Sequence, residues 1–214
     1  MMGPKSVEST RFARTYVRRS QRAEDLGGRQ HRARLLSEAR GSVIELGAGH
    51  GLNFAHYPPA VTGVVAVEPD PYLRGLAAMA ARSGDGPPIE VVGAVGEHLP
   101  FRDRQFDCAV TSLVLCTVPD LTATLGELKR VLLAHGSLHF YEHQAARGFP
   151  LSALQRAGDP LWSVLAGGCH VTRHLVDSIE AAGFTISALE PFPFAARFTS
   201  LLTRPHVMGH ATAQ

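Results

Sequence analysis

A short segment at residues 43–51 constrains the fold more than any other part of the chain. An apolar run at residues 43–46 leads directly into glycines at positions 47, 49 and 51. This pattern is typical of a β-strand, a tight turn and the start of a helix. Glycine suits such a turn because it tolerates positive φ and because its missing Cβ lets a ligand lie against the backbone. The segment therefore predicts a nucleotide-type ligand at the carboxyl end of the first strand.

A second apolar run, at residues 64–67, ends in Glu68, about one helix and a turn after Gly51. An acidic side chain at the tip of the second strand can accept hydrogen bonds from both ribose hydroxyls of an adenosine. Dinucleotide sites use the spacing G-x-G-x-x-G, whereas this chain has G-x-G-x-G. The pair E-x-G-x-G-x-G and V-x-V-E-P resembles motifs I and II of class I S-adenosylmethionine-dependent methyltransferases. An ordinary βα turn of another doubly wound protein is the alternative.

The resemblance implies S-adenosylmethionine as cofactor and S-adenosylhomocysteine as product. The tract G-E-x-L-P-F…F-D, which begins at Gly96, is similar to the loop along the adenine edge in the same class. Many relatives carry an acidic residue where Val95 stands, so backbone groups of Gly96 and Glu97 are expected to replace that contact. The implied cofactor-binding residues are Glu45, Gly47, Ala48, Gly49, Gly51, Asn53, Glu68, Pro69, Gly96, Glu97 and Leu113.

Length and composition predict one globular domain. The chain has 214 residues, of which 45% are apolar, and a formal net charge of only +2, which argues against a dedicated nucleic-acid binder. We expect neither a signal peptide nor a membrane span, because no sufficiently long apolar stretch occurs. Three cysteines without C-x-x-C spacing are typical of reduced thiols. These features favour a cytoplasmic monomer or homodimer with no nucleic-acid or membrane partner.

Residues 1–40 are interpreted as an N-terminal helical segment. Residues 1–10 are expected to be disordered, and residues 11–40 are arginine-rich, helical in composition and divided by the glycine pair 27–28. The arginines are interpreted as a solvated helix face. The alternative is a lid, in which the first helix lies over the cofactor pocket and Tyr16 faces the substrate.

Residues 41–214 predict a single-domain α/β fold, the Rossmann-like methyltransferase fold that the resemblance implies. We expect a seven-stranded, mostly parallel sheet whose last two strands form an antiparallel hairpin, and an insertion at residues 145–172 that covers the substrate. Thr172 is expected to cap a helix that ends before Gly183. The other expected helices are 53–57, 72–82 and 121–133, and the later strands are 89–92, 106–110, 136–142, 185–189 and 206–211.

Several later segments resemble the branch of this class that contains the alkyl thiol S-methyltransferases. The match covers roughly residues 40–212. Animal members of the branch carry an N-terminal membrane anchor, and we expect none here. The resemblance rests on L-V-L-C-T-V at 113–118, Y-E-H at 141–143, D-P-L-W at 159–162, G-C-H-V-T-R at 168–173 and R-P-H-V-M-G at 204–209.

The chemistry of methyl transfer narrows the choice of acceptor. In-line displacement at a sulfonium requires a nucleophile held near attack distance. Such orientation can lower the activation barrier by about 7–11 kcal/mol. A thiol, with a pKa of about 8.5, is already a few per cent thiolate at pH 7, so a weak base is sufficient. An aliphatic alcohol would need a strong base or a metal, and the sequence shows no carboxylate cluster for Mg²⁺.

His143 is the catalytic candidate, because it ends a predicted strand at the edge where ligands bind. The alternative is a loop histidine that only orders Glu142. His135, His139 and His143 share one face of the strand, but steps of four residues separate their side chains by about 13 Å, too far for one ion. No metal site is therefore predicted. The expected substrate-binding residues are Tyr16, Cys116, Trp162 and His170.

The leading hypothesis is a methyltransferase that acts on a small thiol. A phenolic or quinone metabolite, methylated on oxygen or carbon, is the alternative acceptor. A regulatory cofactor-binding module without transfer activity is the alternative from another class, although the intact residues of both cofactor motifs argue against it. An NAD-dependent oxidoreductase is the most distant alternative.

Overall fold

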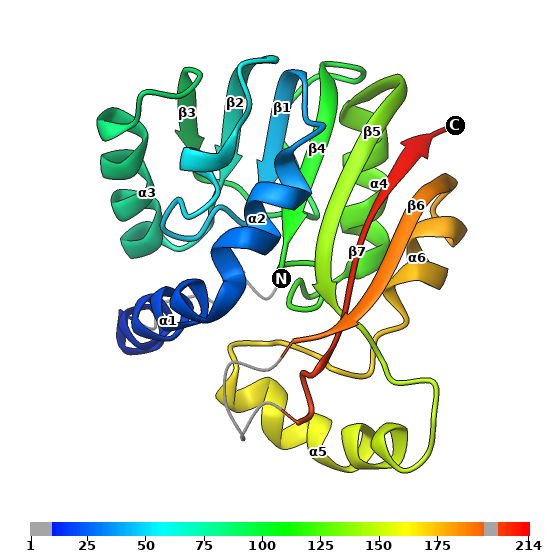
Figure 1. The fold of residues 1–214 in the computed structure, drawn as a ribbon. Helices are drawn as coiled ribbons and strands as arrows, with labels where there is room; N and C mark the ends of the chain where they lie inside the picture. The colour runs from blue at the N-terminus through cyan, green and yellow to red at the C-terminus, as the bar shows by residue number, and fades with distance from the viewer. Residues whose placement is uncertain (1–9, 195–200) are drawn as a thin grey trace, which may run out of the picture.

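A seven-stranded sheet forms the centre of the protein (Figure 1). The computed structural model describes residues 10–194 and 201–214, so the disorder expected at residues 1–10 concerns a segment almost wholly outside the described residues. The strands are β1 (Gly41–Leu46), β2 (Val61–Val67), β3 (Ile89–Val92), β4 (Phe106–Ser112), β5 (Leu132–His143), β6 (Phe184–Pro193) and β7 (Pro205–Ala213). Their order is β3-β2-β1-β4-β5-β7-β6, and β7 runs antiparallel to β5 and β6. This topology confirms the predicted fold class.

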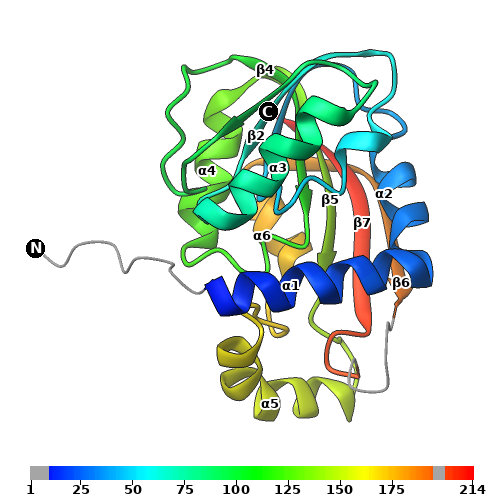
Figure 2. The same cartoon turned by 90° about the vertical axis from the view of Figure 1, so that its left-hand side faces the viewer.

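Helices cover both faces of the sheet. The central strands β1 and β4 are almost entirely buried, and a parallel strand covered on both faces needs apolar side chains in both directions. One face packs against α2 (Arg29–Leu36) and α3 (Pro71–Ser83), and the other against α4 (Leu121–Val131) and α6 (Leu175–Ala181). Figure 2 shows α2 and α4 on opposite sides of the strands. The carboxyl ends of the parallel strands lie at an edge that these four helices leave open, and in this kind of sheet ligands bind at that edge.

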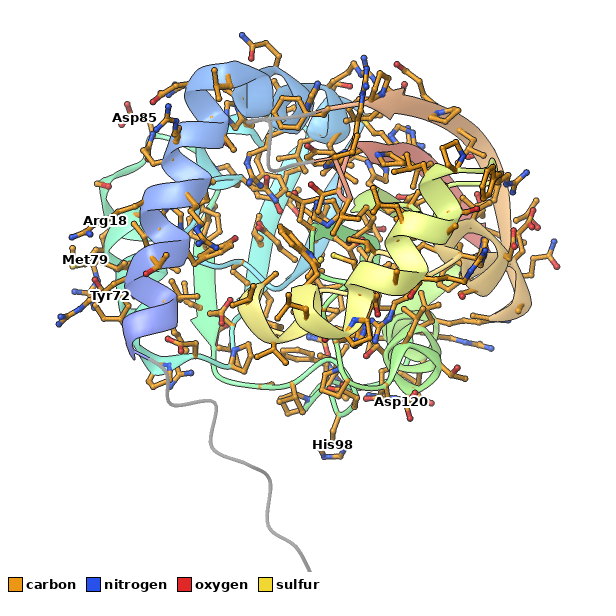
Figure 3. The ribbon with its side chains drawn as sticks, turned by 90° about the horizontal axis from the view of Figure 1, so that it is seen from below. Arg18, Tyr72, Met79, Asp85, His98 and Asp120 are labelled. Carbon is orange, nitrogen blue, oxygen red and sulfur yellow. The ribbon has the colours of Figure 1, made fainter. Side chains whose placement is uncertain are left out.

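Two further helices lie at this carboxyl edge. The N-terminal segment forms α1 (Thr10–Ala23), a π-helical turn η1 (Glu24–Gly28) and then α2. Gly27 has φ 121°, which confirms the predicted break at the glycine pair. Figure 3 looks onto the edge and shows α1 and α5 (Leu151–Leu165) on its two sides. In the described part of the chain, no helix is both long and apolar enough to cross a membrane.

The helix expected at residues 53–57 is wrong, because only the short 3₁₀ turn η2 (Phe54–His56) forms there. Tyr57 is already extended, with ψ 127°. The following residue is Pro58, and a proline ring disfavours the helical conformation of the residue before it. The chain therefore turns directly toward β2 instead of forming a crossover helix.

The expected N-cap at Thr172 is also wrong. Helix α6 begins at Leu175, and His174 at its N-cap position makes no capping hydrogen bond through its side chain. Arg173 instead donates to two carbonyls of the loop after β4, which keeps this segment out of the helix. Gly183, with φ 85°, follows the helix as predicted.

Candidate active site

The turn after β1 needs its glycines for two different reasons. Gly47, Gly49 and Gly51 have φ values of 69°, 58° and 87°, a region that favours glycine. A Cβ at Gly47 would overlap Val114, and one at Gly51 would lie 2.8 Å from the ring of Phe54. The first and last glycines are therefore required by packing within the protein. At Gly49 the three atoms nearest to such a Cβ all belong to the Tyr16 side chain, so this glycine faces α1 instead of the packed interior.

Tyr16 of α1 faces the glycine turn. Its hydroxyl oxygen lies 3.3 Å from the position that a Cβ would take at Gly49. Its ring also meets the His50 ring edge-on, with 6.0 Å between the centroids. Both ring nitrogens of His50 are buried without a hydrogen-bond partner among the described residues. The structure thus places the Tyr16 side chain over the glycine turn.

Glu68 is held rigidly at the tip of β2. One carboxylate oxygen accepts a hydrogen bond from the Gly49 amide at 2.8 Å, and the other accepts from the Asp70 amide at 2.9 Å. Arg74 donates to the carbonyls of Glu68 and Pro69 and so fixes the backbone of this turn. Each carboxylate oxygen has a second lone pair, which leaves acceptor capacity for two hydroxyls. Burial raises the pKa of Glu68 to about 7.

Glu45 and Asn53 lie behind the glycine turn. The two carboxylate oxygens of Glu45 accept hydrogen bonds from the Asn53 amide at 2.9 Å and from the Tyr57 hydroxyl at 2.6 Å. Burial raises the pKa of Glu45 to about 7. The Ala48 amide, like that of Gly47, donates to the Val67 carbonyl at the end of β2. These contacts join the turn to two strand ends and stiffen it.

Arg32 shows that the N-terminal segment is part of the site. Its guanidinium is buried and donates to Glu24 at 2.8 Å, to Asn53 at 2.9 Å and to Ser112 at 3.0 Å. The interpretation of the arginines as a solvated face is therefore wrong for Arg32. The π-helical turn at Glu24–Gly28 changes the direction of the helix, so a regular helical pattern could not predict which arginine would point inward.

The loop after β3 approaches the same edge. Gly96 is buried, and a Cβ there would lie 2.9 Å from the Thr124 side chain of α4. The Glu97 carboxylate accepts from the amide of Asp120, at the N-terminus of α4, at 3.1 Å. Figure 3 shows Asp120 on the same side of the molecule as His98. Val95 is 46% exposed, so this loop presents an apolar residue at the surface.

The turn that follows β4, at residues 113–118, is clamped from two sides. Leu113 has φ 59°, a strained conformation for leucine that costs about 1–3 kcal/mol, and its amide donates to the Tyr141 carbonyl at 2.7 Å. The buried carboxylate of Glu142 accepts from the amides of residues 114–116 at 3.0–3.4 Å. Arg173 donates to two carbonyls of the same turn at 2.6 and 2.7 Å. The strained conformation of Leu113 is tolerated because these hydrogen bonds hold the backbone of the turn in place.

Cys116 in this turn meets His143 and Cys169. The Cys116 and Cys169 sulfurs lie 3.4 and 3.3 Å from Nδ1 of His143, and 3.7 Å from each other. The hydrogen bond between the sulfurs raises the pKa of Cys116 well above its ordinary value and lowers that of Cys169. Burial lowers the pKa of His143, but Cys116 beside it shifts the pKa upward overall. His143 thus lies against two thiols at the carboxyl end of β5.

The predicted insertion contributes the remaining candidates. His170 Nδ1 is 2.8 Å from the Asp159 carboxylate of α5, and the His170 amide donates to the Cys116 carbonyl at 2.8 Å. Trp162 of α5 packs against the cluster that contains Cys116 and Cys169. The structure therefore brings Cys116, His143, Trp162 and His170 together, whereas Tyr16 lies beside the glycine turn.

The sequence patterns predicted no binding or catalytic role for several residues of the site: Arg32, Glu142, Asp159, Cys169 and Arg173. Their partners are distant in the sequence, so spacing alone gives no signal. All of them except Arg32 do stand within motifs of the resembled branch, which is the only indication that the sequence offers.

The comparisons with known proteins agree with this geometry. The family model described as a methyltransferase domain matches residues 44–140. Over 173 residues the chain is 35% identical to thiol S-methyltransferase TMT1B of Rattus norvegicus and 34% identical to TMT1A of Homo sapiens. Each match covers 79% of this chain and 70% of the relative.

Solved structures of low sequence identity share the fold. An S-adenosylmethionine-dependent methyltransferase from Thermotoga maritima has a TM-score of 0.70 at 20% identity, covering 95% of this chain and 97% of that one. Another from Mesorhizobium loti has a TM-score of 0.62 at 19% identity, covering 86% and 96%. The identity to the curated relatives, over 70% of their length, shows that the chain belongs to the thiol S-methyltransferase family of S-adenosylmethionine-dependent methyltransferases.

Proposed function

We propose that this enzyme methylates the sulfur of a small, largely apolar thiol. The observation that carries the proposal is the contact between Val114 and Gly47, which joins the turn bearing Cys116 to the glycine turn. A ligand bound along the glycine turn would therefore have its reactive end beside the apolar turn and His143. Apolar lining by Leu113, Val114 and Trp162 suits an uncharged acceptor.

The residues present fit S-adenosylmethionine, which when bound supplies an electrophilic methyl group on a sulfonium. Glu68 would hold the two ribose hydroxyls, because its oxygens keep free lone pairs while two amides fix their position. Gly49 would let the ligand approach the backbone under Tyr16. Backbone groups of Gly96 and Glu97 would meet the adenine. Leu113 and Pro69 would line the pocket.

Other predicted cofactor residues are better described as supports. Glu45 and Asn53 bond to each other behind the turn, and Arg32 ties Asn53 to the N-terminal segment. We propose that this network positions Gly47, Ala48 and Gly51, and that α1 serves as the lid over the bound cofactor. Ordering the lid would exclude water from the acceptor.

His143 would promote formation of the acceptor thiolate, and Cys116, Trp162 and His170 would border the acceptor. A thiol needs only partial assistance with its proton at neutral pH. The buried pair of thiols beside His143 is consistent with a pocket that accommodates sulfur. A cytoplasmic location, a monomeric or homodimeric state and the absence of nucleic-acid and membrane partners complete the proposal, supported by three unpaired cysteines and a net charge of +2.

Two measurements test this function. Calorimetry is expected to show micromolar binding of S-adenosylhomocysteine and no binding of NAD. Incubation with methyl-labelled S-adenosylmethionine and panels of alkyl thiols, phenols and quinones is expected to label the thiols. Binding of NAD alone would contradict the cofactor assignment, and labelling of phenols or quinones without thiols would contradict the acceptor.

A further inference from the structure

Three side chains that can bind a metal converge from distant parts of the chain. Cys116 comes from the turn after β4, His143 from the end of β5 and Cys169 from the segment after α5. One ligand atom of each lies within 4.8 Å of the other two. The histidine-only site excluded on spacing grounds is a different set, because only His143 of those three takes part here.

The distances within this cluster are those of a tetrahedral zinc site. Zinc binds thiolate sulfur at about 2.3 Å and imidazole nitrogen at about 2.0–2.1 Å, so tetrahedral ligands lie about 3.8 Å apart for two sulfurs and about 3.6 Å for sulfur and nitrogen. The corresponding separations here are 3.7 Å between Cys116 and Cys169, and 3.4 and 3.3 Å from these sulfurs to Nδ1 of His143. Small shifts of the side chains would therefore place all three around one ion.

The backbone holds these ligands together independently of their side chains. The Cys116 amide donates to Glu142, and the Cys116 carbonyl accepts from the His170 amide at 2.8 Å. The segment before Cys169 passes so close to the turn that a Cβ at Gly168 would lie 3.2 Å from the Thr117 carbonyl. Gly168 also has φ 94°, which only glycine adopts readily. Such prior positioning is what a metal site requires.

We propose that Cys116, His143 and Cys169 bind one zinc ion, and that the fourth position of this ion takes the acceptor thiolate. The zinc site itself is inferred from the geometry of the cluster. The binding of the acceptor thiolate at the fourth position rests on the proposed function. Three protein ligands and one exchangeable position are characteristic of catalytic zinc. Two thiolates and one imidazole are soft ligands that favour zinc over magnesium or calcium. The two thiolates also neutralise the ion in this buried place.

The step at the fourth position balances as a ligand exchange. The S–H bond of the acceptor breaks, its sulfur bonds to zinc in place of a water molecule, and the proton leaves to solvent. A coordinating thiol is deprotonated outright by the ion. Nδ1 of His143 would then hold the metal, and His143 would promote the thiolate through zinc instead of accepting the proton itself.

In two other possible states of the cluster, the chain would bind no metal. A disulfide between Cys116 and Cys169 would shorten the sulfur–sulfur distance from 3.7 Å to about 2.05 Å and leave no thiolate for a metal. A pair of neutral thiols that only hydrogen-bond to His143 would bind no metal either. Metal content and thiol titration distinguish both states from the proposed site.

The experiment measures zinc in the purified full-length chain by mass spectrometry, after growth with zinc and dialysis against metal-free buffer. We expect one zinc per chain. Cys116→Ser, Cys169→Ser and His143→Ala are each expected to lower zinc affinity by more than the 10–100-fold typical of losing an outer-shell partner. Cys108→Ala is the matched control, because Cys108 is also buried but lies in β4 outside the cluster. Circular dichroism verifies that each variant is folded.

Cobalt(II) in place of zinc tests the wild-type chain without any substitution. We expect the intense visible bands of tetrahedral cobalt with sulfur ligands, and a shift of these bands when ethanethiol is added without S-adenosylmethionine. Absence of one bound zinc or cobalt per chain, a disulfide, another metal in its place, or retention of zinc in the cysteine variants would overturn the site. If cobalt binds but its visible bands do not shift when ethanethiol is added, the assignment of the acceptor to the fourth position is wrong.

These readouts are separate from methyl transfer. If the chain methylates thiols but binds no zinc, the metal site is wrong and the proposed function stands. If it binds zinc as described but methylates no thiol, the proposed function is wrong and the three-ligand site stands.

Discussion

Replacing Glu68 by glutamine tests the cofactor site with the least structural change. The substitution keeps the size of the side chain. It removes the charge that makes Glu68 a strong hydrogen-bond acceptor, and it replaces one of the two oxygens that accept from the Gly49 and Asp70 amides with an NH₂ group. Hydrogen bonds to a charged group contribute about 1.5–3 kcal/mol. Losing one such bond to a ribose hydroxyl would weaken binding of S-adenosylhomocysteine by about 10- to 150-fold at pH 8. Calorimetric titration measures this change directly.

The raised pKa of Glu68 adds a dependence on pH. Burial raises that pKa to about 7 in the ligand-free protein, and the ribose hydroxyls prefer the ionised carboxylate. Protonation therefore competes with the ligand as the pH falls below about 7. We expect the wild-type affinity to fall by up to about tenfold per pH unit from pH 7 to pH 5. In Glu68→Gln this dependence is expected to be smaller, because the titrating group is gone.

A matched control separates the local effect from a general change in charge. Glu180 lies on the exposed side of α6, so Glu180→Gln removes the same charge without touching the site. We expect its affinity to equal that of the wild type at every pH. The reasoning would be refuted if Glu68→Gln bound as tightly as the wild type at pH 8, or if both shared one pH dependence.

Four further substitutions test the glycine turn, the Arg32 network and the acceptor site. Gly49→Val is expected to abolish measurable calorimetric binding of S-adenosylhomocysteine, because a branched side chain at φ 58° is strained and fills the ligand's space; normal binding would contradict this placement. Arg32→Met leaves Glu24 buried and unpaired and is expected to cost about 3–5 kcal/mol in urea unfolding. Arg34→Met, whose ion pair is exposed, is expected to cost at most about 1 kcal/mol, and equal losses would refute the network. His143→Ala is expected to lower the rate with a thiol about 100-fold at pH 7 and less at higher pH; wild-type rates at every pH would exclude a role for His143.

The parts of the fold that local sequence could predict are the strands and the glycine turn. The runs that became β1 and β2 are apolar because both faces are covered, and Gly47 and Gly51 follow from crowding that only glycine permits. A local rule also explains the helix that was wrongly predicted. The helix expected at residues 53–57 fails at Tyr57, because the effect of Pro58 on its predecessor outweighs the helical composition.

The contacts that assemble the site could not be predicted in the same way. Arg32 meets Ser112 and Glu142 meets the amides near Cys116 across long separations in the sequence. Cys169 reaches His143 only because the insertion folds back over the carboxyl edge. No periodicity encodes such meetings, since they arise from how the sheet and its covering helices pack. The sequence therefore indicates which residues carry chemistry but not which of them meet.

The central claim is that sulfur is the atom methylated, and one acceptor that carries both nucleophiles tests it most directly. The enzyme would be incubated with S-adenosylmethionine and 4-mercaptophenol, whose thiol and hydroxyl compete on the same ring. Proton NMR and mass spectrometry of the product distinguish an S-methyl from an O-methyl group. The account predicts the S-methyl thioether as the enzymatic product, formed faster than in a reaction without enzyme. Enzyme-dependent formation of the O-methyl ether would contradict it.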